Sequence, residues 1–201
     1  MKELTNLQLD ALREAGNIGA GHAAIALSQM MNKKVMMSVV RTEIVPSNVF
    51  LKGFVEEHDP EVAGVYLITL GDTQGAAIFM FQKAAALNLC DLLLTRQRGS
   101  TTFVDEQAQS ALKELGSILT GSFFSVLSDM LHLNFFHKTP LYAEDDAAVI
   151  LYGICDSVFG DRQERLCVTT EFVESNSRIK GSFVFIPTVE TMQKFLTQLQ
   201  V

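Results

Sequence analysis

The first thirty or so residues carry apolar side chains at helical spacing, and no proline interrupts them. Thr5 and Gln8 have the spacing of a capping box, in which each side chain accepts a hydrogen bond from the backbone of the other residue. Alanine, leucine, methionine and glutamine, all good helix formers, then dominate as far as Asn32. The pattern predicts one long helix over residues 5–32.

Patterns typical of strands follow this helix. Residues 34–45 are rich in valine and other apolar side chains and end at Pro46, which predicts a strand. Two more apolar runs flank a Gly71-Asp72 turn and predict a hairpin. The first half is therefore expected to continue with strands at 34–45, 61–70 and 75–81 and a short helix at 83–95.

The second half of the chain repeats this order. Asp105 can cap a helix that runs over about residues 105–132, and an extended stretch follows it as far as Pro140. The remaining predicted elements are a helix through residues 145–159, a hairpin of strands at 165–174 and 181–187, and a C-terminal helix at 188–200.

A short polar motif also occurs twice, one hundred residues apart. Its copies are Asp10, Glu14, Gly16, Asn17 and Gly21, then Ser110, Glu114, Gly116, Ser117 and Gly121. The repeat is too long for a solenoid unit, so we expect one domain, residues 1–201, built by duplication of halves of about 1–100 and 101–201. The expected fold class is α/β of the α+β type, with pseudo-two-fold symmetry and two long helices packed on a mostly antiparallel sheet.

The motif forms a narrow polar stripe on each long helix. At about 100° per residue, Asp10, Glu14 and Asn17 point within about 60° of one another, and Leu12 points to the opposite face. A polar stripe is usually a solvated face, but this one is short and continues with glycine, alanine and serine. The pattern leaves a solvated face and a docking face both open, and we expect the stripes of both helices to point outward.

Glu14 and Asn17 lie one turn apart, so they can act on the same water or ion. A carboxylate accepts hydrogen bonds, whereas an amide both donates and accepts them. Neither side chain is a nucleophile for covalent catalysis. The pair suits hydrolysis by a positioned water, as where a glutamine orients the attacking water in phosphoryl transfer.

Composition excludes several classes of function. The 201 residues are 48% apolar, which indicates a globular protein, and the net charge is −7. An acidic chain without a cluster of basic residues is a poor ligand for nucleic acids or anionic membranes. No apolar run is long enough for membrane insertion. Cys90, Cys155 and Cys167 form no CxxC pattern and indicate reduced thiols in a cytoplasmic protein.

The other candidate groups favour structural roles. His22 lies off the polar stripe, and His132 and His137 flank a predicted helix end, where capping is commoner than metal binding. The acidic residues 144–146 are interpreted as the first turn of a helix. The glycine-rich stretch 16–21 lies within a helix and has no preceding strand and no lysine, which excludes a nucleotide-binding loop.

On these residues the sequence resembles the CheC/CheX/FliY family of chemotaxis phosphatases. The family motif is Asp or Ser, three residues, Glu, two residues, Asn, and then Pro after 22 more residues. Asp10, Glu14 and Asn17 match its first part, and residues 17–35 are similar to those of CheC proteins. The length and the two motif copies also fit CheC better than the shorter CheX.

The resemblance implies a function and the residues that perform it. Asn17 would orient a water for attack on the aspartyl phosphate of a phosphorylated CheY-type response regulator. Glu14 would pair with the regulator's phosphate-site lysine, and Asp10 would support them. The protein would hold no metal or cofactor of its own, because the regulator carries the Mg²⁺.

Two positions depart from the family motif. The proline position falls at Val40 in the first copy. In the second copy Pro140 is in place, but Ser117 replaces the asparagine, and a hydroxyl cannot present the paired donor and acceptor of an amide. We expect this second site, with Glu114 and with Ser110 in the supporting position, to be impaired.

One alternative function stays open. A non-catalytic CheC-like adaptor would bind the regulator, or the receptor deamidase CheD, without hydrolysis. By resemblance, CheD binding would involve the helix at residues 145–159. The intact Glu14 and Asn17 pair favours the enzyme, whereas Ser117 shows that one copy has changed.

Overall fold

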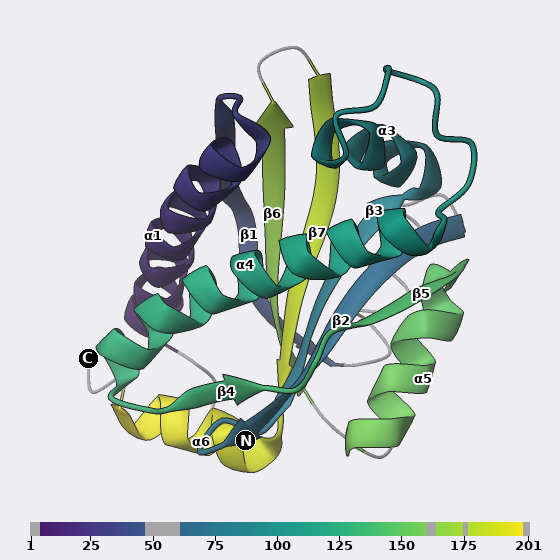
Figure 1. Ribbon diagram of the computed structural model, residues 1–201. Helices are drawn as coiled ribbons and strands as arrows, with labels where there is room; N and C mark the ends of the chain where they lie inside the picture. The colour runs from purple at the N-terminus through teal and green to yellow at the C-terminus, as the bar shows by residue number, and fades with distance from the viewer. Residues whose placement is uncertain (1–4, 47–60, 160–163, 175–176, 199–201) are drawn as a thin grey trace.

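Two long helices, α1 and α4, cross one face of an antiparallel sheet (Figure 1). The computed structural model describes residues 5–46, 61–159, 164–174 and 177–198. The helices are α1 (Asn6–Met31), α3 (Lys83–Leu93), α4 (Glu106–Leu131), α5 (Ala147–Phe159) and α6 (Val189–Gln198). The strands are β1 (Val35–Pro46), β2 (Glu61–Gly71), β3 (Gly75–Gln82), β4 (Phe135–His137), β5 (Leu141–Asp146), β6 (Glu164–Glu174) and β7 (Ser177–Pro187).

Local capping bonds set the ends of both long helices. The hydroxyl of Thr5 accepts the N–H of Gln8 at 3.3 Å, and the Gln8 side chain accepts the N–H of Thr5 at 3.0 Å. The carboxylate of Asp105 caps α4 with a single bond, accepting the N–H of Ala108 at 2.7 Å. Each helix is followed by a residue in the left-handed conformation, Asn32 with φ 48° and His132 with φ 52°. The capping signals in the sequence therefore predicted both helices to within one residue.

In the part of the chain that the structure describes, seven strands form one sheet. Their order is β1-β6-β7-β3-β2-β4, and β5 also pairs with β2. Every pair is antiparallel. Both predicted hairpins, β2 with β3 and β6 with β7, are confirmed, and so is the predicted fold class of long helices packed on an antiparallel sheet.

The central pair of strands relates the two halves of the sequence. Strands β3 and β7 carry the corresponding runs 75–81 and 181–187, and they pair so that Ile78 lies opposite Val184. These two residues occupy the same place in their runs. The pairing is therefore symmetric about this point, as expected for an axis that relates two copies of one unit.

The two outer parts of the sheet correspond less closely. Strands β4 and β5 together span the residues one hundred positions after β1, and both pair with β2 as β1 pairs with β6. Pro140 lies in the gap between them. Strand β1 is continuous, but its register shifts between Val39 and Arg41, which leaves Val40 as an extra residue. The same part of the fold is thus one irregular strand in the first half and two short strands in the second.

Apolar side chains pack on both faces of the central strands. On one face, α1, α3, α4 and α6 cover residues such as Phe79 and Phe183, whose rings lie 4.6 Å apart. On the other face, Leu151 and other residues of α5 cover Ile78 and Val184. The alternation follows from the two-residue period of a strand. Helices α1 and α5 therefore lie on opposite faces of the sheet.

Small residues of α1 allow a close approach to α4. A Cβ atom at Gly19 would lie 2.9 Å from the Cα of Phe123, which is closer than real Cβ atoms come to backbone. The residues of α4 at this crossing, Phe123 and Leu119, are large and buried. The glycine in the first helix therefore provides the space that the second helix fills.

Helix α5 begins two residues later than the sequence pattern predicts. Asp145 and Asp146 end strand β5 and pair with β2, so the interpretation of residues 144–146 as a first helical turn was wrong. The Asp146 carboxylate accepts the N–H of Ala148 at 2.8 Å and caps the helix from outside it. Pairing with a strand that is distant in sequence decided this boundary, and local propensity does not report such pairing.

Candidate functional site

The first copy of the motif lies on an exposed part of α1. The side chains of Asp10, Glu14 and Asn17 are all exposed, and they follow one another along the same side of the helix. A carboxylate and an amide are thus open to solvent at adjacent positions. Any group that they act on can approach from outside the protein.

The backbone of β1 holds the carboxamide of Asn17. Its Oδ1 accepts a hydrogen bond from the N–H of Val39 at 3.2 Å. A backbone N–H can only donate, so the oxygen of the carboxamide is the atom that faces it. The amino group of the same carboxamide is consequently directed away from Val39, and Oδ1 keeps a second lone pair for another donor.

Ser28 joins the same helix and strand at a second point. Its hydroxyl donates to the carbonyl of Ala24 at 2.6 Å and accepts the N–H of Val35 at 2.9 Å. Strand β1 forms one end of the described sheet, so the N–H groups on its outer side have no neighbouring strand. Helix α1 covers this edge and pairs two of those groups through side chains.

The expectation that both polar stripes point outward is only partly correct. In α1 the stripe is exposed from Asp10 to Asn17, but Ala24 is buried and Ser28 is half-buried against β1. In α4 the corresponding Phe124 is 3% exposed and packs in the core. The small residues of the stripe allow β1 to approach α1. A projection of the helix alone does not show this contact, because it contains no neighbouring strand.

The second copy of the motif lacks the bond between amide and backbone. Glu114 is exposed and Ser117 is half-buried, and among the described residues no hydrogen bond joins the side chain of Ser117 to a neighbour. The hydroxyl of Ser110 donates to the carbonyl of Glu106 within the helix at 2.9 Å. Ser128 still binds the chain after its helix, through the carbonyl of Leu133 at 2.7 Å. A serine contact from the helix to the chain that follows it is retained, and the positioned amide is not.

The structure explains why position 40 can differ from the family motif. Val40 is the extra residue at the register shift in β1, and Pro140 lies in the gap between β4 and β5. Proline is tolerated at such irregular points because it cannot donate to a strand ladder. A valine in the first copy keeps β1 continuous, and Val39 immediately before it is the residue that contacts Asn17.

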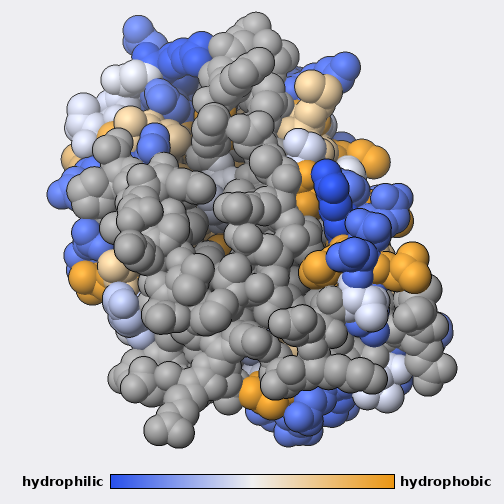
Figure 2. Space-filling view, turned by 180° about the vertical axis from the view of Figure 1, so that it is seen from behind, coloured by the Kyte–Doolittle hydropathy of each residue, from blue (hydrophilic) through white to orange (hydrophobic). Residues whose placement is uncertain are grey.

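Exposed apolar side chains flank the motif on α1. Leu7, Ile18 and Ile25 are 62%, 44% and 60% exposed. At the corresponding positions of α4, Gln107 and Ser125 replace two of them. Seen from behind, hydrophobic and hydrophilic residues lie side by side along the right-hand edge, where α1 lies (Figure 2). The surface around the first motif, on α1, is thus more apolar than the surface around the second motif, on α4.

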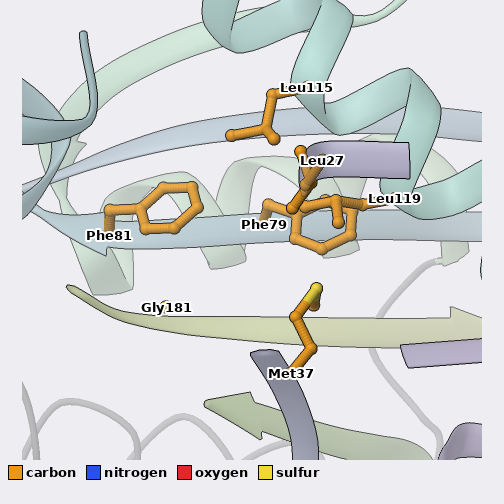
Figure 3. A pocket seen from close by; sticks show the side chains of 7 residues that line it. All are labelled: Leu27, Met37, Phe79, Phe81, Leu115, Leu119 and Gly181. Carbon is orange, nitrogen blue, oxygen red and sulfur yellow. The ribbon is translucent and has the colours of Figure 1, made fainter. Parts of the chain in front are cut away.

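Glu14 and Asn17 lie on the exposed surface of α1. A groove of about 670 Å³ follows the C-terminal half of α1 and is lined by residues between Ala24 and Val35. Beneath α1 and α4 lies a cavity of only about 10 Å³, where Leu27, Leu119 and Met37 surround Phe79 (Figure 3). An apolar space of that size is a packing gap. The exposed site therefore suits a macromolecule better than a small molecule.

A charged cluster that the sequence did not predict joins α3 to β2 and β5. Lys83 Nζ lies 3.0 Å from the Glu144 carboxylate and 3.2 Å from that of Glu61. The hydroxyl of Tyr142 donates to Glu144 at 2.8 Å. This hydrogen bond, together with Lys83, holds the pKa of Glu144 below its usual value. The cluster ties three elements together and is separate from the polar motif.

Within the described ranges, no three His, Cys, Asp or Glu side chains come close enough to share a metal ion. His132 terminates α4 and His22 is exposed on α1. Cys90 is buried, and burial raises the pKa of its thiol to about 11; the side chains of Cys155 and Cys167 lie outside the described residues. No described helix is both long and apolar enough to span a membrane.

The residue that the sequence interpretation missed is Val39. It contributes a backbone group, so its side chain gives no chemical signal. The available signal was a spacing, because Val39 follows Asn17 by 22 residues and directly precedes the proline position of the family motif. A fixed distance between an asparagine and a later strand indicates that the two meet in the fold.

Comparison with known proteins places these features in a family. The profile of the CheC-like family matches residues 7–39, the segment that contains Glu14, Asn17 and Val39. The CheY-P phosphatase CheC of Bacillus subtilis (strain 168) is 30% identical over 200 residues, which cover 96% of this chain and 93% of that protein. The flagellar motor switch phosphatase FliY of the same organism is 28% identical over 60% of this chain and 31% of its own length.

Solved structures share the fold at lower identity. The crystal structure of Thermotoga maritima FliY has a TM-score of 0.79 at 18% identity, and the match covers 98% of both chains. A chain of the FliM-SpeE complex from H. pylori has a TM-score of 0.74 at 14% identity, covering 98% of this chain and 96% of its own length. CheX from Desulfovibrio desulfuricans has a TM-score of 0.54 at 13% identity, covering 87% of this chain and 99% of its own length.

Proposed function

Because this chain belongs to the CheC-like family, we propose that it hydrolyses the aspartyl phosphate of a phosphorylated CheY-type response regulator. One observation in the structure carries the proposal: Glu14 and Asn17 are exposed side by side on α1, with the Asn17 carboxamide already oriented by β1. The open surface around them suits a protein substrate that brings its own phosphoryl group.

In the proposed reaction the chain positions a water and forms no covalent bond. The amino group and Oδ1 of Asn17 supply a donor and an acceptor that fix the water in line with the phosphoryl group. The water oxygen bonds to phosphorus as the bond from phosphorus to the aspartyl oxygen breaks. The products are inorganic phosphate and a free carboxylate, and the protons of the water pass to phosphate and solvent.

The remaining groups provide docking and charge. Glu14 would pair with the phosphate-site lysine of the regulator, which fixes the two proteins in register. The regulator would carry the Mg²⁺ that neutralises the developing charge, so this chain would need no metal or cofactor. Asp10 would extend the acidic side of the contact. The second copy would be impaired because Ser117 cannot replace the amide, and Glu114 and Ser110 would then act at most in docking.

The decisive experiment measures phosphate release from a Mg²⁺-bound, phosphorylated CheY-type regulator. Wild-type protein should accelerate the release, and Asn17→Ala should remove about a hundredfold or more of that acceleration because the water is no longer fixed. Ser117→Ala, the same type of truncation at the equivalent place in α4, is the matched control and should leave the rate unchanged. Circular dichroism would establish that both variants are folded.

Three outcomes would contradict the assignment. An unchanged rate with folded Asn17→Ala would exclude the water-positioning role. A rate that depends on Glu114 or Ser117 would mean that α4 is the active helix. Binding of the phosphorylated regulator without faster phosphate release would instead establish the non-catalytic adaptor. Ser117 favours this alternative, because it shows that one copy of the motif has changed.

We further propose that α5 contacts the receptor deamidase CheD. The family resemblance suggests this helix, and the exposure of Val149 and Tyr152, at 56% and 57%, supports it. Because α5 and α1 cover opposite faces of the sheet, CheD would not compete for the surface around Asn17. Failure of purified CheD to bind the wild-type chain would remove this part of the proposal.

A further inference from the structure

The group that holds the functional amide is a backbone N–H. We propose that the N–H of Val39 is a positioning group for the reaction, because it orients the Asn17 carboxamide so that the amino group faces the bound regulator. The inference rests on the proposed function. It adds a role for β1, a strand whose side chains take no part in the chemistry described above.

Two hydrogen bonds fix β1 relative to α1. Ser28 accepts the N–H of Val35 at 2.9 Å, and Asn17 accepts the N–H of Val39 at 3.2 Å. Val35 and Val39 are four residues apart, so their N–H groups point to the same side of the strand. That side is the outer edge of β1, which has no neighbouring strand in the described sheet. The Ser28 bond fixes the strand, and the Val39 N–H thus reaches Asn17 from a fixed position.

The second copy shows that the fold itself does not require an amide bond at this place. Helix α4 keeps a serine contact to the chain that follows it, from Ser128 to the carbonyl of Leu133 at 2.7 Å. The side chain of Ser117, in contrast, has no hydrogen bond to another described residue. Helix α4 nevertheless contributes buried residues to the same core as α1. The bond between an amide and the following strand is thus present only in the copy with the intact motif, which associates it with the site.

The register shift in β1 immediately follows the donor. Val39 pairs with Thr170 and Arg41 pairs with Thr169, so the extra residue Val40 changes the course of the strand directly after the N–H in question. Such irregularities in a strand redirect neighbouring groups and are common beside functional sites. At the same place in the second half, strand pairing is interrupted, because β4 ends at His137 and β5 begins at Leu141.

Hydrogen exchange of the Val39 amide tests the bond without any measurement of activity. We expect Asn17→Ala to make exchange of this amide about five- to tenfold faster, because its acceptor is lost. Asn17→Asp keeps an acceptor and should retain the protection, yet it should not accelerate phosphate release because it has no amino group. Equal exchange rates in wild type and Asn17→Ala would overturn the proposed bond.

Replacement of one amide by an ester tests the role in the reaction. The α-hydroxy analogue of valine at position 39 removes the N–H and keeps the side chain, so strand packing is preserved. We expect kcat for phosphate release to fall by about ten- to a hundredfold with KM unchanged, because the carboxamide is then free to rotate. The control is the same replacement at Met37, whose N–H lies on the same edge, and it should leave kcat unchanged.

The outcomes separate this inference from the proposed function. If wild type accelerates phosphate release and the ester at position 39 has the same kcat, the positioning role is wrong and the function stands. A higher kcat would also overturn it, because it would make the bond a restraint that must break. If wild type gives no acceleration, the proposed function fails, and the exchange experiment still decides whether the bond exists.

Discussion

A single buried carboxylate shows how strongly one residue can depend on the backbone around it. Asp91 is 2% exposed. It accepts the N–H of Gly99 at 2.6 Å, the hydroxyl of Ser100 at 3.2 Å and the N–H of Thr101 at 3.0 Å. Burial alone would raise its pKa, but these hydrogen bonds outweigh burial and hold the pKa below the ordinary 3.8. The charged form therefore stabilises the turn after α3.

Replacement of this carboxylate should destabilise the protein. We expect Asp91→Asn to lower the free energy of unfolding at neutral pH by about 1–3 kcal/mol, because one amide oxygen cannot satisfy three donors. This difference in unfolding free energy should be largest above the pKa that Asp91 has in the unfolded chain. It should shrink as the pH falls through the lower pKa of the folded state, because wild type then also loses the charge. Urea unfolding across that range checks this, with the exposed Asp129→Asn as control.

At the same scale, the sequence could predict the candidate site only in part. The types and spacing of Glu14 and Asn17 identify a pair that can position a water. They do not reveal that Val39 contacts Asn17, because a backbone N–H is the same at every position other than proline. Lys83, Glu144 and Tyr142 were missed for a related reason: strand pairing and the start of α3 bring them together.

The sequence predicted best those helices and strands whose ends are marked by residues within the element itself or next to it. Helices α1 and α4 have capping residues at their starts and left-handed residues after their ends. Strand β5 has no such signal, because its last three residues, 144–146, are acidic and adjoin a helix. Their pairing with β2 makes them a strand, and a partner about 80 residues away cannot be read from a local pattern.

Two glycines of α1 should respond in opposite directions to the same substitution. Gly19→Ala should lower the free energy of unfolding by about 1–3 kcal/mol, because the new methyl group would meet the backbone of Phe123. Gly21 has no atom within 4 Å of a built Cβ, so Gly21→Ala should raise stability by up to about 1 kcal/mol. Thermal unfolding of both variants checks this. A Gly19→Ala variant as stable as wild type would contradict the close crossing of α1 and α4.

At the scale of the whole molecule, the sheet separates two exposed apolar surfaces. Ile25 on α1 and Val149 on α5 are 60% and 56% exposed, and their helices pack on opposite faces (Figure 1). A regulator on α1 and CheD on α5 should therefore bind at the same time. Docking on one face should not depend on side chains of the other.

Matched substitutions test this separation. Ile25→Ser copies the residue at the equivalent position of α4 and should weaken binding of a beryllofluoride-activated regulator about tenfold, through loss of apolar contact area. Val149→Ser should leave that affinity unchanged and weaken CheD instead. Calorimetric titration of each variant with each partner measures both. Weaker regulator binding by Val149→Ser would show that the two surfaces are coupled.

A chain that contained only one of the two halves would assemble as a symmetric dimer. Its β3-like strand would find a second copy as the neighbour, around a two-fold axis at the position now shared by Ile78 and Val184. In such a pair, any substitution in the long helix appears twice. Fusion of the copies into one polypeptide removes that constraint, so a helix with Asn17 can coexist with one that carries Ser117. In one polypeptide, one long helix can therefore keep the amide of the motif while the other changes.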